Sequence, residues 1–440
     1  MLLQKDRAAM IPPMGWNSWD CFAAAVNEEQ LLGNAEVMGK SLRPFGWEYI
    51  VCDIQWSEPN AGTGPREYID FAKLCLDEYS RQIPAPNRFP SSANGAGFRP
   101  IAEAVHKMGL KFGIHIMRGI PRQAVHAGGE IKGTHATADQ IALPSSICGW
   151  NSDMYGVDAS KPGAQEYYDS LFELYAGWGV DFVKVDDICN TNLYPGNPYS
   201  AEREIELIRH AIDVCGRPMV LSLSPGPAVI EKAWHLEHNA NMWRINDDFW
   251  DRWELLRNMF TRCEIWQKHV SPGCWPDCDM LPLGRIGVNF GHERQTAFTR
   301  EEQITMMTLW CIFRSPLMVG GDLRSLDGWT LSLLTNEEVL RLPAHSFDAA
   351  QLERDDGHAV WCSRDEDGSF YLALFNLSDE RRAIQAPLEE LPFGSADVRD
   401  LWEHRDLGTV SRGLSAELPP HGASLYKLRA KGGPFCGEKE

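Results

Sequence analysis

The chain has 440 residues, of which 44% are hydrophobic and 23% are charged, as in an ordinary globular protein. Its 42 Lys and Arg stand against 61 Asp and Glu, and the net charge of -19 makes nucleic acid and anionic lipid poor partners. There is no signal-peptide pattern and no apolar run of about 18 residues, so we expect a cytoplasmic protein without a membrane span.

Strand-like runs rich in Val, Ile, Phe and Trp alternate with stretches of helical periodicity, such as residues 200–216, which end at Gly216. This alternation predicts a parallel sheet. Seven strands are visible in chain order: "PMGWNSW", "WEYIVCD", "LKFGIHI", "VDFVKVDD", "PMVLSLS", "NMWRIND" and "SPLMVGGD". We expect an eighth near "CEIWQKHVS", which predicts a closed (β/α)8 barrel.

The pattern changes near residue 345, where "GHAVWCSRDEDGSFYLALFNLSDERRAIQA" predicts two short alternating strands around a polar turn. More strand-like pieces follow without a long helix, so we expect a small antiparallel β-sandwich and a frayed tail, "AKGGPFCGEKE". The chain is therefore predicted to hold a catalytic barrel at residues 1–342 and a sandwich at 343–440.

Twelve cysteines are spread from Cys21 to Cys436, and in a long chain without an export signal we expect reduced, buried thiols. The close pair Cys274 and Cys278 has no second pair or histidine cluster at zinc-site spacing, so we expect no metal there.

The strand "DFVKVDD" ends on two carboxylates. Because side chains alternate along a strand, Lys184 and Asp186 point together into the barrel, at the carboxyl end where barrel active sites lie. Asp187 is expected to belong to the following loop. A purely structural ion pair between Lys184 and Asp186 is the alternative.

Other strand ends add carboxylates and indole rings, a combination typical of a sugar or polyol pocket. The carboxylates are Asp53, Asp247, Asp248, Asp251, Asp277 and Asp279, and the rings are Trp16, Trp19, Trp56 and Trp243.

Hydrolysis of a glycosidic bond requires two carboxyl groups that flank it. Lys184 would keep Asp186 ionised, and the second group is expected on the loop after Arg244, as Asp247 or Asp248. The alternation of side chains from Arg244 favours Asp248.

These motifs together resemble glycoside hydrolase family 27, the α-galactosidases and their relatives. The segments that carry the resemblance are "PPMGWNSWD", "VKVDD", "WRINDDFWDRW", "WPDCDML" and "SPLMVGGDL", in order across the barrel. The resemblance implies a retaining enzyme without metal or organic cofactor, in which Asp186 is the nucleophile and Asp248 the acid/base.

The resemblance also implies that Trp16 lines the sugar, that Asp53 and Lys184 bind its hydroxyls, and that Arg244 lies near the 2-hydroxyl. Trp56 and Asp279 complete the expected substrate-binding set.

Three positions depart from the family pattern. Ile54 in "CDIQW" stands where relatives carry a second aspartate, His115 replaces a common tyrosine, and Ser224 lies where many relatives have Cys-Glu-Trp. The role of Ser224 near the 2-hydroxyl and that of His115 at the substrate are therefore open.

Ile54 predicts a preference for terminal β-L-arabinopyranosides, which lack the exocyclic CH2OH of galactose, with α-D-galactosides as poorer substrates. If Ile54 instead faces away from the sugar, the enzyme is an α-galactosidase proper. Rival interpretations are an aldolase that forms a Schiff base on Lys184, or a sugar-binding protein without catalysis. The expected partner is a small sugar or oligosaccharide, and the sequence leaves a homo-oligomer open.

Overall fold

The computed structural model describes residues 2–63, 67–191, 196–386, 394–411 and 413–431. The chain folds into two compact units, the first containing Met1–Asp248, Pro272–Thr296 and Leu317–Asp327, and the second the remainder. The expected boundary at residues 342 and 343 divides the chain by function and stays a prediction. The predicted tail, from residue 432 onward, lies outside the described residues.

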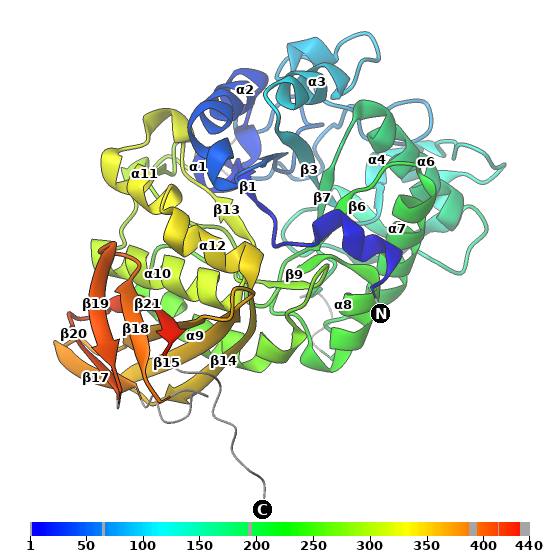
Figure 1. Cartoon of the computed structure of the whole chain (residues 1–440). Coiled ribbons are helices and arrows are strands. Elements are labelled where there is room, and N and C mark those ends of the chain that lie inside the picture. The colour runs from blue at the N-terminus through cyan, green and yellow to red at the C-terminus, as the bar shows by residue number, and fades with distance from the viewer. Residues whose placement is uncertain (1, 64–66, 192–195, 387–393, 412, 432–440) are drawn as a thin grey trace, which may run out of the picture. The chain divides into compact units, whose positions relative to one another are not determined.

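A parallel sheet of eight strands forms the centre of the first unit (Figure 1). In chain order the strands are β1 (Met14–Asn17), β2 (Tyr49–Cys52), β3 (Lys111–Met117), β7 (Phe182–Asp186), β8 (Val220–Leu223), β9 (Met242–Arg244), β10 (Trp275–Asp277) and β13 (Leu317–Val319). β13 pairs with β1, and Leu281, which follows β10, forms a parallel bridge to Val319. The sheet therefore curls into a closed barrel, as predicted.

The predicted position of the eighth strand is wrong. "CEIWQKHVS" forms the end of α9 (Trp253–Trp266) and the turn η7 (Gln267–His269), whereas the eighth strand is β10. The buried residues of α9 recur at helical spacing: Leu256, Met259, Phe260, Cys263 and Trp266. β10 has only three residues and contains a proline, so its sequence carries little strand signal.

Helices surround the barrel strands in the first unit (Figure 1). The longer ones are α2 (Glu28–Val37), α3 (Arg99–Lys107), α6 (Ala164–Trp178), α7 (Glu202–Val214) and α8 (Ala233–Asn239). The shorter elements are α1 (Trp19–Phe22), α4 (Arg122–Ala127), α5 (Ala138–Ile141), and the strands β4 (Ile120–Pro121), β5 (Ala142–Ile147), β6 (Met154–Val157), β11 (Arg285–Ile286) and β12 (Arg294–Gln295).

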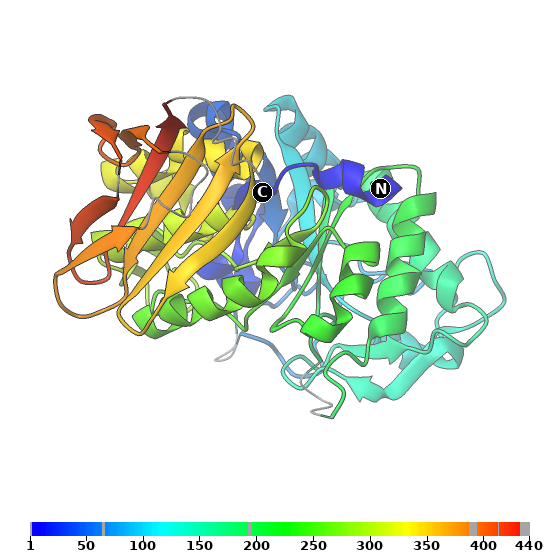
Figure 2. The ribbon, with the colours of Figure 1, turned by 60° about the horizontal axis from the view of Figure 1, so that its bottom comes forward.

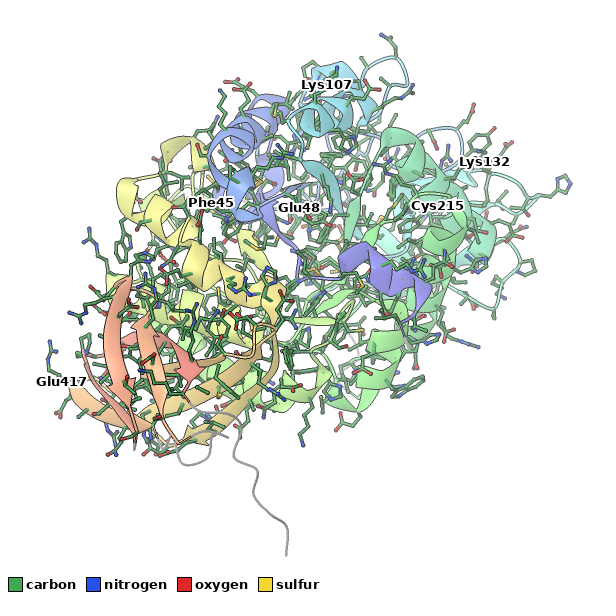
Figure 3. The ribbon with its side chains drawn as sticks, in the orientation of Figure 1. Phe45, Glu48, Lys107, Lys132, Cys215 and Glu417 are labelled. Atoms are coloured by element: carbon green, nitrogen blue, oxygen red, sulfur yellow. The ribbon has the colours of Figure 1, made fainter. Side chains whose placement is uncertain are left out.

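The amino terminus closes one end of the barrel. The turn η1 (Gln4–Ala9) lies against the residues that precede β9 and β10: Trp275 Nε1 donates to Ala9 O at 2.7 Å, and Asn241 Nδ2 donates to Lys5 O at 3.0 Å. Glu48, labelled in Figure 3, marks this same amino-terminal end just before β2. The opposite end, where the strands finish, carries the polar side chains of the candidate site.

Two antiparallel sheets form the predicted sandwich in the second unit. One has the order β14-β15-β16-β21-β18-β19, whose long strands lie side by side in Figure 2, and the other pairs β17 with β20. The bounds are β14 (Ser346–Arg354), β15 (His358–Asp365), β16 (Phe370–Asn376), β17 (Arg382–Ala386), β18 (Ala396–Asp400), β19 (Arg405–Val410), β20 (Leu414–Leu418) and β21 (Ala423–Ala430). Residues of both sheets share one apolar core, for example Leu374, Leu428 and Ile384.

The helices α9, α10 (Arg300–Phe313), α11 (Gly328–Leu334) and α12 (Glu337–His345) belong to this second unit. Phe260 of α9 meets Phe375 of β16 edge to face, with 4.9 Å between ring centroids. Helices on one face and sandwich core on the other explain why β16 is buried at all seven positions instead of alternating. Within the described part of the chain, none of the helices combines the length and apolar character needed to cross a bilayer.

Candidate active site

Asp186, the last residue of β7, is held by groups from three elements. Its Oδ1 accepts hydrogen bonds from the backbone N of Asp187 at 2.9 Å and from Ser224 Oγ at 3.1 Å. Its Oδ2 lies 3.3 Å from His115 Nε2 of β3. The carboxyl group keeps 13% of its side-chain surface exposed, so it is oriented by the protein and still open to a ligand.

His115 lies between two carboxylates. Its Nδ1 is 2.8 Å from Asp53 Oδ1, opposite the contact of Nε2 with Asp186. Asp53 follows β2, and its Oδ2 is 3.7 Å from Lys184 Nζ. Each ring nitrogen of His115 therefore has a carboxylate oxygen beside it. Lys184, Asp53 and His115 thus form a chain of contacts that ends at Asp186.

Burial and charged neighbours have opposite effects on the pKa values of Asp186, Asp53 and Lys184. Burial by itself raises the pKa of Asp186, but the interactions with His115 and Lys184 outweigh it, and the pKa lies below its ordinary value. Burial likewise opposes ionisation of Asp53, whose pKa the same two neighbours bring far below the usual range. For Lys184, burial lowers the pKa but Asp53 and Asp186 raise it above the ordinary value. Lys184 is therefore an ammonium ion, a poor nucleophile for a Schiff base.

Replacing His115 with glutamine is expected to move the acidic limb of the kcat/KM profile to higher pH, because the contact with His115 that favours the ionised form of Asp186 is removed. A pH series with an arabinopyranoside substrate measures this shift. The exposed His210 on α7 supplies the control variant, His210→Gln, which should leave the limb in place. An unchanged limb in His115→Gln would show that His115 does not govern the ionisation of Asp186.

Asp248 lies in the loop after β9, with 63% of its side chain exposed. Arg244, the last residue of β9, connects it to the barrel: Arg244 Nη2 is 3.2 Å from Asp248 Oδ1 and 2.7 Å from Asp279 Oδ2. Asp247 is also exposed, and its Oδ1 accepts the backbone N–H of Asp248 at 2.9 Å. Asp248 thus contacts Arg244, and its choice over Asp247 as the acid/base stays a prediction.

Asp279 and Arg244 form a buried pair below Asp248. Burial raises the pKa of Asp279 to about 7, although the charge of Arg244 opposes this rise. For Arg244, burial lowers the pKa, but Asp279 and Asp248 raise it more, so the guanidinium stays charged. The positive charge of Arg244 therefore lies beside the exposed carboxylate of Asp248.

Ile54 directly follows Asp53, and its backbone N donates to Asp53 Oδ1 at 2.9 Å. The side chain is 2% exposed and packs with Met117, Cys148 and Met154. An apolar wall thus adjoins the carboxylate at the position where relatives are expected to carry a second aspartate.

Two of the predicted substrate-binding tryptophans, Trp16 and Trp56, are buried and donate hydrogen bonds to the backbone. Trp16 has no exposed surface, and its Nε1 donates to Gly321 O at 2.8 Å. Trp56 is buried, and its Nε1 donates to His115 O at 2.8 Å, which holds that strand in place. Trp19, in contrast, is only partly buried and packs against the Ile54 cluster. We therefore propose that Trp19 takes the ring-lining role expected of Trp16.

Asp20 was missed by the sequence reasoning, although it ends the quoted motif "PPMGWNSWD". It is 3% exposed, and its Oδ2 has no hydrogen-bond partner among the described residues. Burial first, and then the charge of Asp279, raise the pKa of Asp20 well above its ordinary value. A Cβ on Gly320 would clash with this oxygen, so only glycine fits beside it. The raised pKa favours the protonated form of Asp20, and its Oδ2 is left with hydrogen-bonding capacity.

Two family models match this chain. The family model of α-galactosidase A matches residues 132–344, and that of the α-galactosidase C-terminal β-sandwich domain matches residues 355–428. The chain is similar to α-galactosidase 2 of Arabidopsis thaliana, with 26% identity over 97% of this chain and 91% of that protein.

Solved structures are more similar still. A family 27 β-L-arabinopyranosidase from Geobacillus stearothermophilus is 54% identical, with a TM-score of 0.95 and all of both chains covered. An aspartate-to-alanine variant of that enzyme, in complex with arabinose, is 55% identical, with a TM-score of 0.95 over 98% of this chain and 100% of that one. The barrel, its carboxylates and these matches define a glycoside hydrolase. Within that class, the chain belongs to glycoside hydrolase family 27, the α-galactosidase family.

Proposed function

We propose that the protein is a retaining exo-glycosidase that hydrolyses terminal β-L-arabinopyranosides, with α-D-galactosides as poorer substrates. The observation that carries the specificity is the buried Ile54 beside Asp53. The 54% identical β-L-arabinopyranosidase and the arabinose-bound variant support the same choice of sugar. In this proposal the barrel of residues 1–342 is the catalytic domain.

The reaction follows from the two carboxyl groups. Asp186 attacks the anomeric carbon while Asp248 gives its proton to the departing oxygen, and a glycosyl ester forms on Asp186. Water then attacks the anomeric carbon, the bond from that carbon to Asp186 breaks, and Asp248 accepts the proton of that water. Two inversions at one carbon give net retention. His115 and Lys184 keep Asp186 ionised for the first step.

Ile54 selects against the exocyclic CH2OH of galactose. A carboxylate at this position would accept a hydrogen bond from a sugar hydroxyl, whereas isoleucine would leave the buried hydroxyl unpaired, at a cost of about 1 to 3 kcal/mol. A pyranose that ends in a methylene has no hydroxyl to satisfy. Apolar contact with Ile54 and its neighbours Met117 and Met154 then favours the arabinoside.

The test compares kcat/KM for p-nitrophenyl β-L-arabinopyranoside and p-nitrophenyl α-D-galactoside in the wild type and in Ile54→Asp. We expect the wild type to prefer the arabinoside and Ile54→Asp to shift the ratio toward the galactoside by about ten-fold or more. Ile54→Leu is the matched control and should keep the wild-type preference. A wild type that favours the galactoside, with a ratio that Ile54→Asp does not move, would make the protein an α-galactosidase proper.

A further inference from the structure

The loop that carries Ile54 is held on both sides of that residue. On the side of β2, the backbone N of Asp53 donates to Ser18 Oγ at 2.9 Å. On the other side, Gln55 is 5% exposed, and its Nε2 donates to Asp153 Oδ2 at 2.8 Å. No step of the proposed hydrolysis uses Gln55 or Asp153.

Asp153 comes directly before Met154, the first residue of β6. Met154 packs in the apolar cluster of Ile54, and it pairs with Pro121 of β4. Gln55 follows Ile54 in the chain, just as Met154 follows Asp153. The hydrogen bond between Gln55 and Asp153 therefore connects the two segments whose apolar side chains form the wall.

The backbone of Gln55 has an unusual conformation. Its φ is 70°, in the left-handed region that residues with a side chain adopt only rarely. Such a conformation persists where the surrounding structure fixes it. The hydrogen bond to Asp153 is one of the contacts that fix it here.

The carboxyl group of Asp153 is buried at a cost in solvation. It is 4% exposed, and burial raises its pKa to about 6, although the hydrogen bond from Gln55 and the charge of Arg122 oppose this rise. An apolar side chain at this position would avoid that cost. The carboxylate provides what an apolar side chain lacks, which is a directed acceptor for Gln55.

The loop has a second support that does not involve Asp153. Arg88 Nη1 donates to Gln55 O at 2.5 Å and to Glu58 O at 2.9 Å. These two bonds hold the backbone of the loop, so its course should persist when the carboxylate of Asp153 is removed. Loss of Asp153 should then let the two segments of the wall separate without unfolding the loop.

We propose that Asp153, acting through Gln55, is a positioning residue that sets the preference for the arabinoside. The proposal rests on the proposed function, because it assumes that Ile54 faces the sugar. With the two segments connected, Ile54 and Met154 stay packed together and leave no room for the exocyclic CH2OH of a galactoside. Without the connection, the galactoside gains space and the arabinoside loses apolar contact.

The experiment measures kcat/KM of Asp153→Ala for p-nitrophenyl β-L-arabinopyranoside and for p-nitrophenyl α-D-galactoside. We expect the ratio of arabinoside to galactoside to fall by about five-fold or more. KM for the arabinoside should rise more than kcat falls, because the lost contact stabilises the bound substrate and the transition state alike. A general loss of structure would lower both kcat/KM values together and leave their ratio unchanged.

Two further variants test the hydrogen bond itself. Asp153→Asn keeps an oxygen that can accept from Gln55 and should retain most of the wild-type ratio. Gln55→Asn tolerates the left-handed backbone, but its side chain is one methylene shorter, so it should lower the ratio as Asp153→Ala does. Because both substitutions remove one contact, combining Gln55→Asn with Asp153→Ala should lower the ratio little further.

Asp181→Ala is the control. Asp181 directly precedes β7, at the end of the barrel opposite the candidate site, and its Oδ2 accepts the backbone N–H of Phe112 at 2.9 Å. This variant should lose stability and keep the wild-type ratio.

A ratio that neither Asp153→Ala nor Gln55→Asn moves, or one that Asp181→Ala moves as much, would overturn the proposal. A wild type that favours the galactoside would contradict the proposed function instead. The two failures are distinguishable, because the change of ratio between the wild type and Asp153→Ala still decides whether Asp153 positions the wall.

Discussion

Alanine in place of Asp186 is expected to lower kcat/KM by roughly 10⁴-fold or more, because the variant has no atom that can form the glycosyl ester. The variant should still fold, because the substitution removes only the acceptor of two hydrogen bonds, those from Ser224 Oγ and from the backbone N of Asp187. The measurement is hydrolysis of p-nitrophenyl β-L-arabinopyranoside at equal concentrations of folded protein, checked by circular dichroism.

Azide distinguishes the roles of the two carboxyl groups. In Asp186→Ala a small anion can enter the space of the missing carboxylate and attack the anomeric carbon once, which gives a glycosyl azide of inverted configuration. In Asp248→Ala the ester still forms on Asp186, so azide should give a product of retained configuration. Nuclear magnetic resonance of the two products reads this directly. The same configuration from both variants would contradict the assignment.

Arg118→Ala is expected to destabilise the protein by about 3 to 5 kcal/mol, because it leaves two carboxyl groups buried without their cation. Arg118 follows β3, and its guanidinium lies 2.8 Å from Asp187 Oδ2 and 3.0 Å from Glu204 Oε1. All three side chains are nearly inaccessible to solvent. Urea denaturation of both proteins measures the difference in the free energy of unfolding.

This variant should also lower kcat more than KM rises. Asp187 has a φ of 54°, a left-handed conformation that is unusual for a residue with a side chain, and its backbone N orients Asp186. Arg118 holds Asp187 through both its carboxylate and its backbone oxygen. Without this hold the nucleophile loses its fixed direction.

The surface supplies a matched control for this loss of charge. Arg203 on α7 pairs with Glu206 at 3.0 Å, and both side chains are well exposed. Arg203→Ala should cost less than about 1 kcal/mol, because solvent screens such pairs. If Arg118→Ala lowered the free energy of unfolding by an amount as small as Arg203→Ala does, the buried network would contribute little more than an ordinary surface pair.

Strand and helix periodicity, together with the placement of carboxylates at strand ends, determined the barrel and the sandwich from the sequence alone. Successive side chains of a strand point to opposite faces, and β7 is a regular strand. The sequence therefore placed Lys184 and Asp186, two residues apart, on the same face. The position of the eighth strand could not be predicted because β10 is a stretch of three residues with a proline, which carries almost no strand signal. The apolar residues of α9, which precedes β10 in the chain, indicated a strand in its place.

Only the tertiary structure decided which partners these residues have. His115 meets Asp53 and Asp186 across three strands that lie far apart along the chain, and no local pattern specifies that contact. The burial of Trp16, the partial burial of Trp19 and the raised pKa of Asp20 depend likewise on packing between loops. The sequence by itself determines periodicity and residue type, but distances and desolvation are properties of the folded chain, so charge states and binding surfaces had to come from the structure.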